Sequence, residues 1–215
     1  MARVQIMRRL GLAGLCVLVL PFALYALDFG WRGLTQDLSG ETYLWRPDAP
    51  GPTNALMVHM IAGAVITLLV PVQAALGAYG RWPEIHRMLG RGVVIACLVT
   101  AFGGLWFIAH VGTLGGRLMD VGFTMYGALM LLASLKLCLR AWERDWAAHR
   151  QWALRLVVLA LASWMFRVHY GLWYLLTGGW GSQPDLRGAF DQIQVFAFYL
   201  PYLLVLELWL RRRRA

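Results

Sequence analysis

Charged residues are scarce in this chain of 215 residues. Only 14% of them are Asp, Glu, Lys or Arg, whereas 60% are hydrophobic. A soluble domain carries roughly a quarter charged residues. The scarcity therefore excludes an ordinary soluble domain and predicts an integral membrane protein.

Acidic residues are rarer than basic ones. The chain has 11 Asp and Glu against 20 Lys and Arg, for a net charge of +9. Such an excess can indicate nucleic-acid binding, but here the arginines gather at the ends of apolar stretches and no polar domain carries a binding face. We interpret the charge as anchoring beside anionic lipid and expect no nucleic-acid partner.

Paired cysteines and nucleotide-binding motifs are absent. Cys16, Cys97 and Cys138 are scattered over separate apolar stretches, without the spacing of a zinc site or of covalent haem attachment. The sequence also has no P-loop, no dinucleotide-binding glycine pattern and no HExxH motif. Any electron donor must therefore be external, such as a quinol, a small reductant or a redox protein.

Long apolar runs dominate what is present. Six stretches approach or exceed the 20 or so residues that a transmembrane helix needs. They predict an all-α bundle of six transmembrane helices near residues 8–28, 54–78, 88–112, 117–139, 152–177 and 188–210. We expect one transmembrane domain over 1–215, with 29–53 as its only sizeable connection.

The arginines orient these helices. Basic residues flank the start of the first span, the second and fourth connections and the end of the chain, and the alternate connections carry few. The basic set is Arg3, Arg8, Arg9, Arg81, Arg87, Arg91, Lys136, Arg140, Arg144, Arg150, Arg155 and Arg211 to Arg214. The positive-inside rule then places both termini in the cytoplasm of a bacterial inner membrane and 29–53 in the periplasm. We expect the first span to be an uncleaved signal-anchor; the alternative is a signal peptide.

Two histidines lie near the periplasmic ends of neighbouring spans. His59 is about 7 Å into the second span at 1.5 Å per residue, and His110 is near the end of the third. Neutral imidazole is a good ligand for haem iron, and two facing imidazoles can hold a b-type haem. The alternative is that each histidine is satisfied by water or a carbonyl.

Two further histidines lie on the cytoplasmic side, each next to an arginine. They occur as His86-Arg87 and His149-Arg150. A ligand histidine beside a guanidinium suits haem, which carries two propionates. The alternative is simple anchoring at a helix end.

Arg167 lies well inside the fifth span, where an uncompensated charge costs several kcal/mol. Its candidate partners are Asp120, Asp191 or a haem propionate. Pro71 and Pro201 predict local kinks, and Glu207 is expected to reach toward Arg211.

The chain resembles a bacterial family of multi-helix membrane proteins known as domain of unknown function 2306. The resemblance covers roughly residues 55–170, a four-helix core. It is carried by the two His-Arg motifs, by His59 with Gly63, Pro71 and Gln73, by Ala109-His110 with Gly115-Gly116, and by Arg167.

More distantly, the histidine distribution is similar to that of ascorbate-linked transmembrane di-haem b cytochromes. That resemblance implies two haems, paired as His59 with His110 and His86 with His149, with His169 as a spare or an alternative to His110. One or two b-type haems are thus expected, with Arg87, Arg150 and Arg167 in the cofactor sites.

Three functions remain open at this point. The first is a haem protein that relays electrons across the bilayer or to and from quinone, as a membrane oxidoreductase or electron-transfer subunit. The second is a non-redox subunit or assembly factor of a larger membrane complex, or a homo-oligomer. The third, a transporter, lacks the inverted repeat that would support it.

Overall fold

The computed structural model is entirely helical over the residues it describes, which are 2–80 and 82–213, with side chains described from residue 11 onward. The helices are α1 (Ala2–Thr35), α2 (Pro50–Tyr79), α3 (Pro83–His110), α4 (Arg117–Trp142), α5 (Trp146–Thr177), α6 (Ala189–Ala197) and α7 (Leu200–Arg212). Six helical stretches are long and apolar enough to cross a membrane, as predicted, with α6 and α7 together forming the last. Of the orienting arginines, Arg3, Arg8, Arg9, Arg81 and Arg214 lie outside the described side chains.

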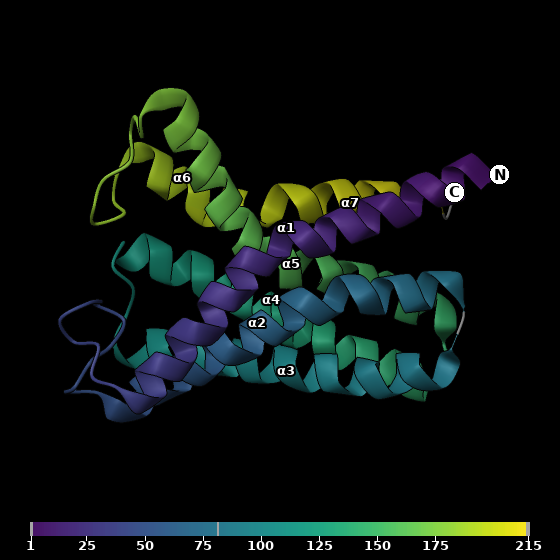
Figure 1. Cartoon of the computed structure of the whole chain (residues 1–215), viewed down its shortest axis with the longest axis horizontal. Coiled ribbons are helices and arrows are strands. Elements are labelled where there is room, and N and C mark those ends of the chain that lie inside the picture. The colour runs from purple at the N-terminus through teal and green to yellow at the C-terminus, as the bar shows by residue number, and fades with distance from the viewer. Residues whose placement is uncertain (1, 81, 214–215) are drawn as a thin grey trace.

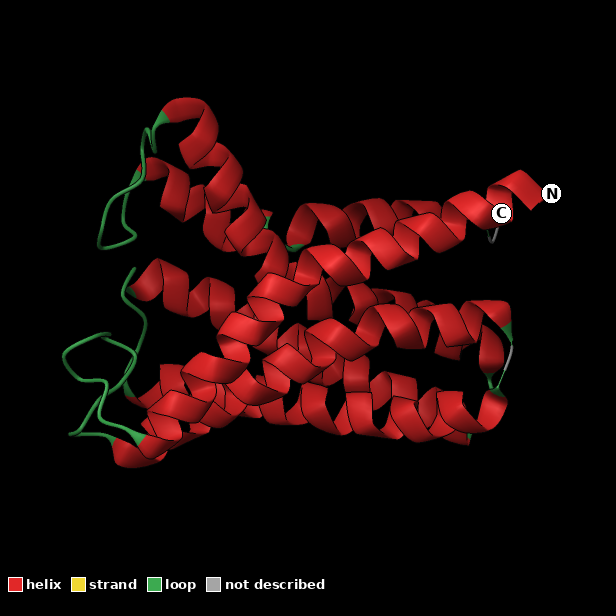
Figure 2. Cartoon of the chain, in the orientation of Figure 1, coloured by secondary structure: helices red, strands yellow, loops and turns green. Residues whose placement is uncertain are grey.

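The helices run side by side, with both chain termini at the same end of the bundle (Figure 1). We call this the terminal end; it also carries the connections at 80–82 and 143–145. The opposite, loop end carries the longer connections at 36–49, 111–116 and 178–188 (Figure 2). The even number of spans explains why the two termini lie at the same end of the bundle.

Four helices form a closed ring in the order α2, α3, α4, α5, because each packs against the next and α5 packs back on α2. In this ring α3 and α5 face each other diagonally, as do α2 and α4. Helix α1 lies outside the ring against α2, while α6 packs on α4 and α7 on α5. This arrangement gives the ring an interior that four different helices can line.

The last span is broken at Phe198 and Tyr199, immediately before Pro201, whereas α2 continues through Pro71. Proline lacks a backbone N–H and blocks the preceding turn, so a break is favoured before Pro201. Phe198 and Tyr199 are fully buried there, and the Tyr199 hydroxyl donates to the carbonyl of Gly122 on α4. The predicted distortion at Pro201 therefore becomes an aromatic contact that fixes the last span to the ring.

Candidate intramembrane sites

A cavity of about 130 Å³ lies inside the ring toward its loop end, closed on the outside by α1. Most of its walls are apolar, and α1 to α5 all contribute. Its polar lining consists of His59, Thr100, Tyr126, Ser163 and Arg167. Polar groups at this depth in a membrane protein mark a functional site by default.

His59 is fixed on α2 by a hydrogen bond to α3. Its Nδ1 lies 2.5 Å from the carbonyl oxygen of Thr100. A carbonyl only accepts, so Nδ1 carries the hydrogen and donates it, which leaves Nε2 as the free ring nitrogen. The side chain lies against two glycines of α3: a Cβ added at Gly103 would lie 3.0 Å from Cβ of His59, and one added at Gly104 would lie 3.0 Å from its Nδ1. The close approach of α2 and α3 therefore depends on these two glycines.

Arg167 has no carboxylate partner among the described side chains. Its Nη1 donates to the carbonyl of Ser163, 3.0 Å away, and its guanidinium lies 4.6 Å from the ring centre of Phe22 on α1. The side chain is exposed at the mouth of the cavity. Burial raises the pKa of the Tyr43 phenol in the 36–49 connection, and the nearby Arg167 charge opposes that rise. The positive charge is thus surrounded by neutral groups.

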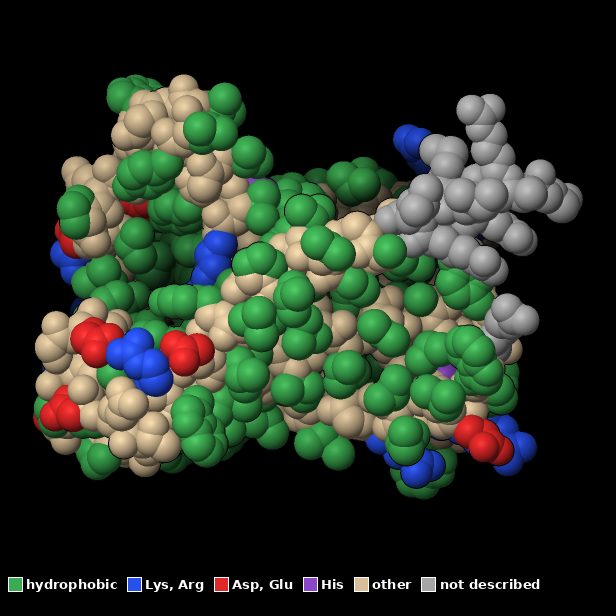
Figure 3. Space-filling view, viewed as in Figure 1, with side chains coloured by type: hydrophobic (Ala, Val, Ile, Leu, Met, Phe, Trp, Pro, Cys, Tyr) green, Lys and Arg blue, Asp and Glu red, His purple; other side chains and the backbone are tan. Residues whose placement is uncertain are grey.

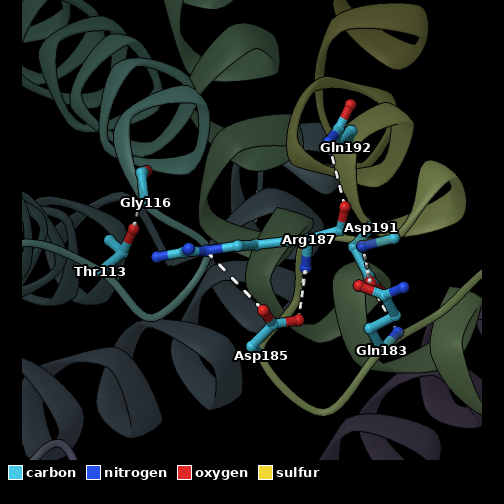
Figure 4. Close-up of polar contacts among 8 residues, drawn as sticks. Thr113, Gly116, Gln183, Asp185, Arg187, Asp191 and Gln192 are labelled. Carbon is cyan, nitrogen blue, oxygen red and sulfur yellow. Dashed lines mark hydrogen bonds and ion pairs between the residues drawn. The ribbon is translucent and has the colours of Figure 1, made fainter.

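Neither of the predicted protein partners of Arg167 reaches it. Asp120 instead accepts from the backbone N–H and the hydroxyl of Thr113, both at 2.7 Å. Asp191 is fully buried and organises the 178–188 connection (Figure 4). It accepts hydrogen bonds from the Tyr170 and Ser182 hydroxyls and from the backbone N–H groups of Gln183 and Gly188. The expectation of an Arg–Asp pair at Arg167 is therefore wrong.

His110 does not meet His59. It is exposed at the end of α3, where Nδ1 lies 2.9 Å from the carbonyl of Trp106 and the ring lies 4.4 Å from the Trp106 ring, centre to centre. His59 touches α3 at Thr100 to Gly104, which at 1.5 Å per residue is about 9–15 Å below His110. The two imidazoles therefore lie at different levels of α3, and the structure does not bring together the facing pair expected from their spacing.

His86 and His149 lie near one another at the terminal end. His86 is in the first turn of α3 with its ring against Gly77 of α2, and its Nδ1 is buried without a hydrogen bond. His149 lies in the first turn of α5, and its Nδ1 is 3.1 Å from the carbonyl of Leu137 on α4. The two imidazoles are close enough to interact electrostatically. They come from the diagonal helices of the ring.

The arginines next to these histidines are both exposed. Arg87 and Arg150 extend from the terminal end, and neither makes an ion pair within the described chain. Their guanidinium groups are therefore available to an anion at the surface of the bundle.

His169 is held by two side chains of the last span. Its Nδ1 lies about 3 Å from the side-chain amide of Gln194, and its Nε2 lies 2.7 Å from the Tyr202 hydroxyl. With both ring nitrogens engaged, His169 links α5 to α6 and α7. It does not join His59 or Arg167.

Sequence reasoning missed the Thr100, Tyr126 and Ser163 side chains of the cavity and the partner of Glu207. The Thr100 hydroxyl lines the cavity but has no recognisable motif, because threonine is common in apolar helices. Glu207 was assigned to Arg211, but it instead forms a two-point ion pair with Arg155, with distances of 2.5 and 2.9 Å. Only helix packing reveals that partner, which is 52 residues away.

The described residues contain no group of three or more His, Cys, Asp or Glu that could hold a metal ion by themselves. Among curated proteins and among solved structures, no significant match was found. Residues 56–210, which include most of α2, all of α3 to α6 and most of α7, match the family described as "Predicted membrane protein (DUF2306)". The chain therefore belongs to the DUF2306 family of predicted membrane proteins.

Proposed function

We propose that this chain is an electron carrier of the bacterial inner membrane that holds one b-type haem between His86 and His149. The observation that carries the proposal is the position of these two imidazoles, which lie in the first turns of α3 and α5 at the terminal end, on diagonal helices of a four-helix ring. Ligands on facing helices are the usual way for a helix bundle to hold a cofactor in its core.

The ring nitrogens of both histidines include one that a metal could bind. Nδ1 of His149 lies at hydrogen-bond distance from the Leu137 carbonyl, and this contact orients the ring and leaves Nε2 for a metal. Nδ1 of His86 is buried with no partner in the described structure, and an unmet buried polar atom costs roughly 1–3 kcal/mol. A metal bound through this Nδ1 would remove that cost.

The charges nearby suit haem rather than a bare metal ion. Haem carries two propionates, and Arg87 and Arg150 each follow a candidate ligand directly in the chain. When bound, haem supplies one-electron chemistry, and the chain sets its environment through axial ligands, burial and local charge. Electrons would be exchanged with a quinone or a redox protein, since no motif for a soluble nucleotide cofactor is present.

One haem is favoured over two. His110 lies at the surface and engages its own helix, while both nitrogens of His169 already have partners. His59 thus has no second histidine at its level among the described residues. We therefore assign no haem to the loop end of the bundle.

The test is a visible spectrum and a pyridine haemochrome assay of the full chain, purified in detergent from haem-replete cells. We expect one haem per chain, with a sharp reduced α band. His86→Ala and His149→Ala should each abolish haem binding, whereas His110→Ala and His169→Ala serve as matched controls and should retain it. A colourless, monodisperse wild-type protein would overturn the proposal and leave a non-redox membrane subunit as the function.

A further inference from the structure

We propose that the cavity at the loop end binds the carboxylate of a small weak acid with a compact apolar body, and that Arg167 is the residue that holds it. This site is separate from His86 and His149. It therefore stands or falls independently of haem.

No carboxylate of the described chain balances the charge of Arg167. A positive charge inside a membrane span normally pairs with a carboxylate or reaches the interface. The two carboxylates that the sequence suggested, Asp120 and Asp191, each accept other hydrogen bonds, and Arg167 has only a carbonyl and an aromatic ring. A carboxylate ligand would supply the missing charge, and the planar guanidinium suits it in a two-point contact.

The same cavity contains a hydroxyl group that makes no hydrogen bond. The Thr100 side chain lines it, is only 6% exposed, and its Oγ1 has no hydrogen bond. Helix threonines usually satisfy themselves by bonding the carbonyl four residues earlier. Thr67 on α2 does so, with Oγ1 2.7 Å from the Gly63 carbonyl. Thr100 departs from this pattern, and an oxygen acceptor from outside the chain would take the hydrogen bond that its hydroxyl does not make within the chain.

The size and the lining of the cavity suit a compact apolar group. An apolar cavity of about 150 Å³ holds benzene, and this one, at about 130 Å³, is slightly smaller. Ile66, Leu105 and Phe123 contribute apolar wall. The space therefore suits a single ring or a short alkyl segment, with the carboxylate at the Arg167 mouth.

A ligand can reach the cavity from outside the bundle at Arg167. Arg167 is exposed and meets Phe22 of α1, so the mouth lies between α1 and α5. Figure 3 shows the surface hollowed between α1 and the arm formed by the end of α5 and α6. A ligand reaches this mouth either from water at the loop end or from the bilayer. The shared chemistry is the carboxylate, and the two sources are separated by experiment.

The test uses the full chain in phosphatidylcholine nanodiscs, with benzoate titrated by calorimetry as the water-borne acid and octanoate, whose alkyl chain is short, as the bilayer-borne one. We expect saturable one-to-one binding of at least one of them. Binding of benzoate alone assigns a water-borne ligand, and binding of octanoate alone or competition by octanoate assigns a bilayer source. Benzyl alcohol, which lacks the charge, should bind at least 10-fold more weakly than benzoate.

Variants test the named groups. Arg167→Met should weaken binding 10- to 100-fold, the usual worth of a hydrogen bond to a charged group, and Arg167→Lys should weaken it less. Thr100→Val should weaken it about 5-fold, while Thr67→Val, the matched control, should leave it unchanged. Failure of both acids to bind the folded wild type, or equal binding by Arg167→Met, would overturn the proposal. Monodispersity and helical circular dichroism establish that each variant is folded.

Discussion

Two of the three arginines of helix α5, Arg155 and Arg167, lie in opposite electrostatic surroundings. Arg155 in its terminal half forms a two-point ion pair with Glu207 of α7, and its side chain is 15% exposed. Arg167, 12 residues or about 18 Å further along, has no carboxylate in the described structure and lies exposed beside a cavity. Arg155 is thus paired with a carboxylate, whereas Arg167 on the same helix is not.

We interpret Arg155 as a structural charge and Arg167 as the charge of the proposed anion site. Arg155 is balanced within the chain, and its guanidinium also lies 4.5 Å from the Trp152 ring centre, so it joins α5 to α7. Arg167 gains little from its neighbours. A charge kept in a membrane span without an internal partner is the arrangement expected of a site that an external anion completes.

The largest effect should come from breaking the paired arginine. Glu207→Met leaves the Arg155 charge partly buried and alone, and should lower the free energy of unfolding by about 2–3 kcal/mol. The value lies below that of a fully buried pair because the Glu207 side chain is 36% exposed. Denaturation in mixed micelles measures it. The double variant Arg155→Met/Glu207→Met should recover most of the loss; if it does not, the pair is not the cause.

A smaller effect is expected at Asp191, the carboxylate that Arg167 does not use. Asp191→Asn replaces an acceptor of four hydrogen bonds by a group that must donate on one side, and should destabilise the fold by about 2 kcal/mol. Limited proteolysis should also cut the 178–188 connection faster. The exposed Asp185 is the control, and Asp185→Asn should change stability by less than about 0.5 kcal/mol. Equal effects at both positions would contradict the assignment.

A third change removes the contrast by giving Arg167 a partner. Phe22→Glu places a carboxylate on α1 where the guanidinium now meets an aromatic ring. The new pair should alter the free energy of unfolding by no more than about 1 kcal/mol, because its attraction offsets the cost of burying the acid. Benzoate affinity should fall at least 10-fold, whereas Phe22→Leu should keep it. Undiminished affinity in Phe22→Glu would argue against Arg167 as the anion-binding group.

The smallest stability effect should follow from Arg167→Met. It loses one hydrogen bond and one ring contact but also removes an uncompensated charge, so the free energy of unfolding should stay within about 0.5 kcal/mol of the wild type. Denaturation in mixed micelles again measures it. A loss as large as that of Glu207→Met would show that Arg167, like Arg155, holds the fold together.

The helices could be predicted from the sequence, but their contacts could not. Twenty-residue apolar runs fix the number of spans, and Pro201 indicated the distortion in the last one. The partners of Arg155, Arg167 and Asp191 depend on how each helix is rotated and tilted. Spans that are apolar on all sides carry little signal about rotation, since a soluble helix reveals its buried face by the contrast with its polar face.

The same limit explains the outcome for the histidines. Distance along the chain placed His59 and His110 near one membrane face, and both lie toward the loop end. Their depth relative to each other depended on how α2 and α3 pack, and the helices come so close at Gly103 that an added Cβ would lie 2.5 Å from the Ala55 carbonyl oxygen. The matched depth inferred from span boundaries alone was therefore not found.

Gly104, which has no side chain, leaves the space that the His59 imidazole occupies beside the cavity. An alanine methyl group there would lie 3.0 Å from Nδ1 of His59, in the space that the imidazole fills when it donates to Thr100. The direction of that imidazole is thus set by the absence of a side chain one turn further along α3. A relative with alanine at this position would keep every polar group of the cavity and still present a differently turned histidine to whatever enters it.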